Sequence, residues 1–173
     1  LGLCYGMQLA CVEYARNVLG LKDANSVECD ETTPNPIIYM NKLQEENKLR
    51  RAYGGTMRLG RWECKVKEGS IADNSYIKYS GYDDINKRVV GERHRHRYEF
   101  NDAYAKAIED KGLIISGRSL IENLTEIVEL PKEIHPFFLG TQYHPEYRSL
   151  PLKPHPLFLA YIRACLDYEK LVQ

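Results

Sequence analysis

The chain opens on a cysteine between two glycines, and this feature constrains its fold more than any other. Gly2 and Gly6 stand two residues before and two residues after Cys4. Glycine tolerates the crowded or left-handed backbone that a sharp turn from a strand into a helix requires. Residues 7–19 have the pattern of a helix, and Gly20 is typical of its end. Cys4 is therefore expected at a helix N-terminus, where N–H groups and the helix dipole favour a thiolate.

A cysteine beside an apolar segment is often only a small buried hydrophobe. The flanking glycines favour a nucleophile instead, because the spacing is that of the Gly-x-Ser-x-Gly turn with sulfur in place of oxygen. Such a turn needs a strand before it, and only three residues precede Cys4. We therefore expect residues 1–173 to be the C-terminal part of one domain whose upstream half is not in this chain.

Composition excludes several classes of protein. The 173 residues are 43% hydrophobic and 28% charged, as in one water-soluble globular domain. Lys and Arg (24) balance Asp and Glu (24), which argues against nucleic acid or an anionic membrane as the main partner. No apolar run is long enough to cross a bilayer. Five cysteines without a Cys-x-x-Cys pair favour free thiols over disulfides or a metal site, and hence a cytoplasmic location.

Alternating strand and helix patterns predict an α/β fold with a mostly parallel open sheet flanked by helices. Helices are expected at residues 101–111, after an Asn101 cap, and at 156–171. Strands are expected at residues 37–40, 61–67, 113–117, 124–130 and 137–143. Residues 25–28 are expected to form a loop, residues 54–60 a glycine-rich turn, and the charged residues 41–53 a surface loop or short helix that could act as a lid.

Residues 92–98 are dense in Arg and His. From composition, a solvated basic face is the favoured interpretation. The alternative is a strand that presents its Arg side chains on one face and its His side chains on the other.

A second group of reactive residues lies near the other end of the chain. His144 ends the expected strand 137–143, and Cys4 follows another, so the two could meet where ligands gather in an α/β sheet. His144 would take the thiol proton. Glu146 would orient the imidazole if the chain stays extended, which completes a Cys-His-Glu triad. A triad of this kind performs acyl transfer, with the Tyr5 N–H as one oxyanion donor; the sequence offers no convincing second donor.

These motifs resemble those of the class I glutamine amidotransferases, and more closely those of the glutaminase domain of the CTP synthase family. The elbow and His144-Pro145-Glu146 are shared by the wider class. The resemblance to CTP synthases rests on three further blocks, residues 25–28, 54–60 and 92–98. It implies the class I amidotransferase (flavodoxin-like) fold.

The resemblance implies that Cys4, His144 and Glu146 hydrolyse L-glutamine through a glutamyl thioester. The glutamine-binding residues would be Tyr5, Gly6, Met7, Gln8, Glu28 and Arg97. Glu28 would suit the substrate ammonium, and Arg97 its carboxylate.

The same resemblance implies that the ammonia serves a synthase domain, absent here, that aminates UTP to CTP with ATP and Mg. No metal or cofactor is expected within these residues. GTP would be an allosteric activator, and the full-length enzyme would be a homo-oligomer, a tetramer.

Three rival functions remain. The domain could serve a different synthase, such as one that makes GMP, carbamoyl phosphate or anthranilate, although the Arg/His block argues against this. It could be a cysteine hydrolase of γ-glutamyl substrates. It could also be a non-catalytic domain that only binds its partner, which the intact Cys4, His144 and Glu146 disfavour.

Overall fold

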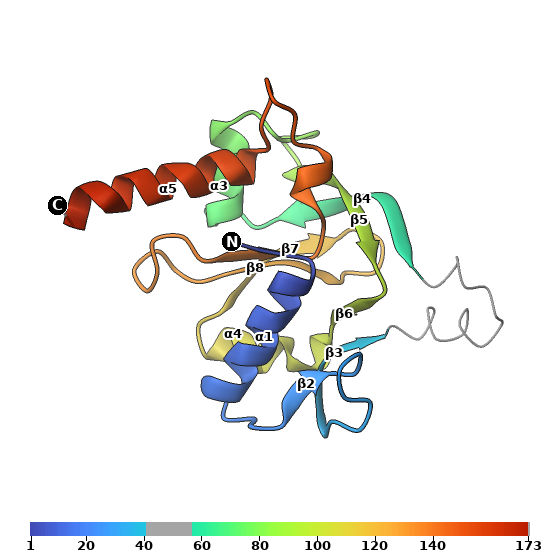
Figure 1. The fold of residues 1–173 in the computed structure, drawn as a ribbon. Helices are drawn as coiled ribbons and strands as arrows, with labels where there is room; N and C mark the ends of the chain where they lie inside the picture. The colour runs from blue at the N-terminus through green and yellow to red at the C-terminus, as the bar shows by residue number, and fades with distance from the viewer. Residues whose placement is uncertain (41–56, 173) are drawn as a thin grey trace.

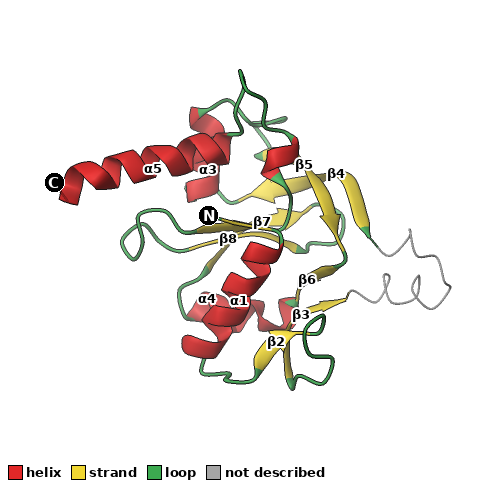
Figure 2. Ribbon diagram, viewed as in Figure 1, coloured by secondary structure: helices red, strands yellow, loops and turns green. Residues whose placement is uncertain are grey.

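The computed structural model describes residues 1–40 and 57–172, which form two sheets and the helices that cover them (Figure 1 and Figure 2). The expected lid at 41–53 and the start of the expected turn at 54–60 lie outside the described residues. The strands are β1 (Gly2–Leu3), β2 (Ala24–Ser26), β3 (Asn35–Met40), β4 (Arg58–Val66), β5 (Val89–His96), β6 (Tyr98–Phe100), β7 (Ile114–Ser119), β8 (Thr125–Glu129) and β9 (Leu139–Thr141). The α-helices are α1 (Tyr5–Asn17), α3 (Ile71–Lys78), α4 (Ala105–Asp110) and α5 (Pro156–Val172), with 3₁₀ turns η1 (Asp102–Tyr104) and η2 (Pro145–Tyr147).

The α/β class is confirmed, but the described sheet is mixed and not mostly parallel. Its strand order is β1-β9-β8-β7-β4-β5, and only β1 and β9 run parallel in it. Parallel neighbours need a crossover of a dozen or more residues. The segments 120–124 and 130–138, which link β7 to β8 and β8 to β9, are shorter than that, so these strands pair antiparallel. A smaller sheet has the order β2-β3-β6.

The main sheet is covered on both faces, and each face has its own apolar core. Side chains alternate along a strand, so neighbouring residues of β8 serve different cores. Val128 packs with Met7 and Cys11 of α1, whereas Ile127 packs with Tyr76 of α3 and Leu157 of α5. In Figure 1, α1 and α4 lie on one side of the sheet and α3 and α5 on the other.

The helix and strand predictions hold for most segments. The expected helix at residues 7–19 is α1, and Gly20 follows it at φ 79°. The expected helix at 101–111 is η1 plus α4, and the Asn101 side chain caps it by accepting a hydrogen bond from the Ala103 N–H. The other expected strands and the last helix are present with shifted ends. These segments carry strong local signals, which explains the agreement.

Three segments differ from expectation. Helix α3 was not anticipated, although the Ser70 side chain caps it by accepting from the Asp73 N–H, a Ser-x-x-Asp signal. Residues 25–28 were expected as loop, but Asn25 and Ser26 belong to β2, which pairs parallel with β3. Residues 58–60, expected as part of a glycine-rich turn, begin β4 and pair with β5. In each case backbone pairing or capping outweighed weak residue propensity.

The Arg/His block is the strand that was the less favoured alternative. In β5, His94 and His96 are buried, and Arg93 and Arg95 are exposed. The favoured prediction of a solvated basic face therefore holds for Arg93 and Arg95 but not for the two histidines. The period of two in the sequence was the correct signal, because a strand between a core and solvent sorts alternate residues.

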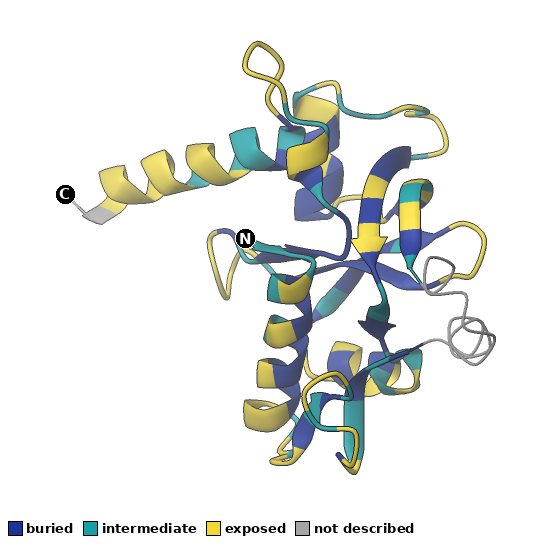
Figure 3. Ribbon diagram, turned by 45° about the vertical axis from the view of Figure 1, so that its right-hand side comes forward, coloured by how far each residue is buried: buried dark blue, intermediate teal, exposed yellow. Residues whose placement is uncertain are grey.

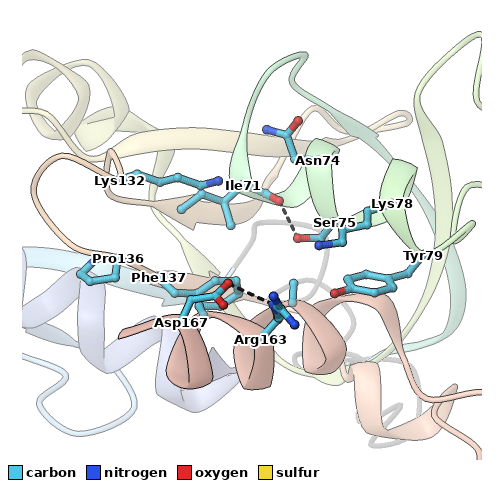
Figure 4. A pocket seen from close by; sticks show the side chains of 12 residues that line it. Ile71, Asn74, Ser75, Lys78, Tyr79, Lys132, Pro136, Phe137, Arg163 and Asp167 are labelled. Atoms are coloured by element: carbon cyan, nitrogen blue, oxygen red, sulfur yellow. Dashed lines mark hydrogen bonds and ion pairs between the residues drawn. The ribbon is translucent and has the colours of Figure 1, made fainter. Parts of the chain in front are cut away.

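Helix α5 extends away from the body of the molecule, and most of its length is exposed (Figure 3). A hollow of about 180 Å³ lies between α3 and α5 (Figure 4). Its lining includes Ile71, Phe137 and Arg163, and Arg163 pairs with Asp167 on the same helix. None of the residues predicted to act on glutamine lines this hollow.

Candidate active site

The turn from β1 into α1 places Cys4 in a strained conformation. Cys4 is the N-cap of α1 and has φ 48° and ψ −102°, in the region that favours glycine. Holding a non-glycine residue there costs on the order of 1–3 kcal/mol. The Cys4 N–H donates to the Thr141 carbonyl at 2.6 Å, which ties the turn to the end of β9. The fold therefore fixes the backbone that carries the thiol.

The two flanking glycines have different roles. A Cβ on Gly2 would lie 2.9 Å from the Gly6 carbonyl carbon, so the strand and the helix approach each other too closely for a side chain. A Cβ on Gly6 would meet no atom of the described residues within 4 Å. The close turn therefore requires Gly2, whereas the need for Gly6 does not arise from packing within the turn.

Parallel pairing of β1 with β9 brings the two ends of the sequence together. Leu3 pairs with Thr141, so Cys4 and His144 both follow carboxyl ends of neighbouring parallel strands, as predicted. The His144 N–H donates to the Arg93 carbonyl of β5 at 2.8 Å. Arg148 donates to the Gly91 carbonyl, also in β5. Hydrogen bonds to β5 therefore anchor this loop at His144 and again at Arg148.

His144 and Glu146 form the predicted pair, but not through an extended chain. His144 Nδ1 lies 2.5 Å from Glu146 Oε1. Residues 145–147 form the 3₁₀ turn η2, in which Pro145 occupies the first turn, so the tight turn brings the carboxylate back to the ring. Tyr147 stacks on the imidazole with the ring centroids 4.8 Å apart. His144 Nε2 has no hydrogen-bond partner among the described residues.

The environment of Cys4 keeps its thiol protonated at neutral pH. The pKa of Cys4 is raised to about 11, chiefly by burial and in smaller part by the charges of Glu146 and Glu28. Hydrogen bonds from the Tyr5 backbone and the Gln142 side chain act in the opposite direction. The expected preference of the helix N-terminus for a thiolate is outweighed by this burial. A base is therefore needed to activate the sulfur.

The Tyr5 backbone hydrogen-bonds to the Cys4 sulfur, so the donor predicted for an oxyanion does lie at the reactive atom. The Tyr5 side chain is 47% exposed, and its hydroxyl lies 3.5 Å from Cys29 Sγ. Met7, predicted to bind glutamine, is fully buried, and its side chain packs against Gly140.

The charged residues predicted to hold glutamine lie around Tyr98. Glu28 is exposed and Arg97 is half-buried. The pKa of Tyr98 is raised by burial and by Glu28, and lowered by Arg97, so both charges act on one phenol. The charge of Glu28 also raises the pKa of the Cys4 thiol. Gln8 is 3% exposed, and its Nε2 donates to the Tyr98 carbonyl at 2.9 Å. A cation and an anion thus lie near one side chain, close to the elbow.

Gln142 also lies at this site, although the sequence patterns did not predict it. This fully buried side chain contacts both Cys4 and Gln8. It stands within residues 137–143, whose apolar pattern predicts a buried strand and masks a single glutamine. A polar amide at the end of a buried strand, two residues before His144, is the signal that could have found it.

In residues 1–40 and 57–172, no group of three or more His, Cys, Asp or Glu side chains is arranged to hold a metal ion. Within the same ranges, no helix has the length and apolarity needed to cross a membrane.

A strained cysteine at a helix N-terminus, beside a His-Pro-Glu turn, defines a class of enzyme. The family model described as glutamine amidotransferase class-I matches residues 1–164, and the chain belongs to this family. Its relatives include the CTP synthases of Aquifex aeolicus (49% identical) and Caldanaerobacter subterraneus (52% identical), each over 98% of this chain. The chain spans 29% of the length of each of these two relatives.

A solved structure supports the same grouping. The glutaminase domain of Trypanosoma brucei CTPS, with bound acivicin, superposes with a TM-score of 0.81 at 33% sequence identity. The match covers 96% of this chain and 59% of that one. The predicted class I amidotransferase fold and the resemblance to CTP synthase glutaminase domains are both confirmed.

Proposed function

We propose that this chain hydrolyses L-glutamine with a Cys4-His144-Glu146 triad. The observation that carries the proposal is the parallel pairing of β1 with β9, after which Cys4 and His144 follow on neighbouring strands. The sulfur is protonated at rest because burial raises the pKa of Cys4 to about 11. His144 has one ring nitrogen on Glu146 and leaves Nε2 for the proton.

In the proposed reaction, His144 Nε2 takes the Cys4 proton as the sulfur attacks the side-chain carbonyl carbon of glutamine. The Tyr5 N–H stabilises the oxyanion. The imidazolium returns its proton to the amide nitrogen, the C–N bond breaks, and ammonia leaves a glutamyl thioester. Water, deprotonated by His144, then attacks the thioester and releases glutamate and the free thiol. Glu146 stabilises the imidazolium in both halves.

Substrate orientation would come from two charges and one buried amide. Glu28 would pair with the ammonium of glutamine, and Arg97 with its carboxylate. The backbones of Tyr5, Gly6 and Met7 and the side chain of Gln8 would complete the binding site. The charges that act on Tyr98 support this arrangement, because they place both signs near one phenol.

For the whole enzyme, we propose that the ammonia aminates UTP to CTP in a synthase domain that uses ATP and Mg outside these residues. GTP would stimulate glutamine hydrolysis, and the enzyme would act as a homotetramer in the cytoplasm. The likeness to CTP synthases over 98% of this chain supports these proposals.

Replacement of the nucleophile tests the proposal in the full-length protein. Cys4→Ala should abolish glutamine-dependent CTP formation, leaving ammonia-dependent formation intact, because ammonia enters after the thioester step. Cys165→Ala, which removes an exposed thiol of α5, is the matched control and should keep both activities. Loss of both activities in Cys4→Ala would contradict the division of labour.

Two further measurements separate the rival functions. A glutamine-analogue electrophile should label Cys4 and not Cys165; a missing adduct would favour a domain without catalysis. Turnover of γ-glutamyl peptides faster than glutamine would favour the γ-glutamyl hydrolase instead.

A further inference from the structure

The buried side-chain amides of Gln142 and Gln8 link the Cys4 sulfur to the backbone of β6. Gln142 Nε2 donates to Cys4 Sγ at 3.5 Å, and Gln142 Oε1 accepts from Gln8 Nε2 at 3.2 Å. Gln8 Nε2 also donates to the Tyr98 carbonyl at 2.9 Å. Gln142 and Gln8 are 0% and 3% exposed. The reactive sulfur is therefore held by a chain of groups that solvent hardly reaches.

The direction of every hydrogen bond in this chain is fixed by its far end. A backbone carbonyl can only accept, so the Tyr98 carbonyl requires the amide nitrogen of Gln8. The second N–H of that nitrogen then requires an acceptor, which must be the Gln142 oxygen. The Gln142 nitrogen is consequently left facing the sulfur. A flipped Gln142 amide would set two nitrogens against each other and the oxygen against the thiol.

The backbone of Gln142 is fixed as firmly as its side chain. The Gln142 N–H donates to the Glu126 carbonyl of β8 at 2.8 Å. The residue lies between Thr141, whose carbonyl accepts from the Cys4 N–H, and the loop that carries His144. One short segment therefore holds the backbone of the nucleophile, its sulfur and its base.

We propose that Gln142 is a positioning residue for the nucleophile, which donates its side-chain N–H to the Cys4 sulfur and favours the anionic form that attacks glutamine. Gln8 sets the direction of this bond. An N–H donor stabilises a thiolate more than a thiol, because hydrogen bonds to charged groups are the stronger ones. The inference rests on the proposed function in one respect, the role of Cys4 as nucleophile.

Alkylation of Cys4 by iodoacetamide tests the proposal without any substrate. Only the thiolate reacts, so the rate follows the thiolate fraction. The rate would be measured in the full-length protein between pH 7 and 9 by mass spectrometry of the Cys4 peptide. Gln142→Met, which removes the donor, should slow alkylation about tenfold at every pH. Gln142→Glu keeps the acceptor for Gln8 but places a carboxylate at the sulfur, and should be slower still.

Gln8→Met provides a second variant that leaves Gln142 in place. Without Gln8, the amide of Gln142 is free to turn, and its N–H faces the sulfur only part of the time. Alkylation should therefore slow less than in Gln142→Met. Ser70→Ala is the matched control for general loosening, because it removes the cap of α3, which costs about 1 kcal/mol. It should not slow alkylation. A merely structural role of Gln142 would loosen the site and speed alkylation, which is the opposite sign.

Rates in both Gln142 variants at or above wild type would overturn the proposal. Glutamine hydrolysis gives the second readout, in which kcat should fall about tenfold and KM should change less than threefold. If wild type failed to hydrolyse glutamine while the variants still slowed alkylation, the proposed function would fail and the role of Gln142 would stand. If hydrolysis held and alkylation did not slow, the reverse would be true.

Discussion

Two histidine sites lie near each other in this fold and have opposite environments. At the proposed triad (Cys4, His144, Glu146), the His144 side chain is 17% exposed and has a carboxylate on Nδ1. In the buried histidine cluster (Arg58, His94, His96, Glu126), the side chain of His94 is 0% exposed. His94 Nδ1 lies 2.8 Å from His96 Nε2, and His96 Nδ1 lies 3.1 Å from the Tyr98 carbonyl. His144 thus pairs with a carboxylate, whereas His94 and His96 are buried and hydrogen-bond to each other.

The buried cluster is kept free of imidazolium charge. Burial first, and then the positive charge of Arg58, lowers the pKa of His94 to about 2 and that of His96 to about 3. Arg58 instead pairs with Glu126, with Nη1 2.5 Å from Oε1. Positive charge on His144 opposes protonation of both buried rings. Both buried rings therefore stay neutral at neutral pH, and Arg58 carries the positive charge beside them.

The largest difference between the two sites should appear in turnover. His144→Asn should lower kcat for glutamine about 10³-fold, since it removes the proposed base. Its melting temperature should change little, because the side chain is partly exposed. His94→Asn should instead lower the free energy of unfolding by about 1–3 kcal/mol, since it leaves buried polar groups unpaired.

Both variants would be compared by kcat and by thermal melting. His135→Asn, which alters a surface histidine, is the control. A large kcat loss in His94→Asn at unchanged melting temperature would reverse the assignment of roles.

The next largest effect should come from Gly2 and Gly6, the two glycines that flank Cys4. Gly2→Ala forces a methyl to within 2.9 Å of the Gly6 backbone. We expect a loss of about 1–3 kcal/mol in unfolding free energy. Gly6→Ala meets no neighbour in the described residues and should fold as wild type. Chemical denaturation measures both, and equal destabilisation by the two changes would contradict the asymmetry.

The smallest effect should be a slope of stability with pH in the buried cluster. A depressed folded pKa contributes stability that is present above the unfolded value, about 6.5, and lost as pH falls through that value toward about 3. Glu126 has the opposite sign, because burial raises its pKa to about 7, so its stability contribution is lost as pH rises. A variant that removes one histidine and keeps Glu126 isolates the contribution of that histidine from the opposing contribution of Glu126.

His96→Gln leaves one donor and one acceptor in place but does not titrate. Its unfolding free energy should fall less steeply between pH 6 and 4.5 than that of wild type. The difference should approach about 1.4 kcal/mol per pH unit. Urea unfolding at a series of pH values measures it. Parallel curves for the two proteins would mean that His96 is not held neutral by the fold.

The sequence predicted those elements whose ends are marked by nearby residues, such as glycines and capping side chains. The elbow, α1, the Asn101-capped helix and the pairing of His144 with Glu146 followed from glycines, caps and spacing. The extended chain at Glu146 was wrong, since Pro145 starts a 3₁₀ turn instead. The preference for a thiolate was also wrong, because burial of the Cys4 sulfur is invisible in the sequence around it.

By itself, the sequence determined which groups are candidates to react: one thiol between glycines, one imidazole and the carboxylate two residues after it. The tertiary structure decided the pairing of β1 with β9, the protonation of the buried rings and the contact of Gln142 with the sulfur. The physical reason is that local signals act over a few residues. Burial, strand register and hydrogen-bond direction depend on groups separated by as much as 138 positions in the chain.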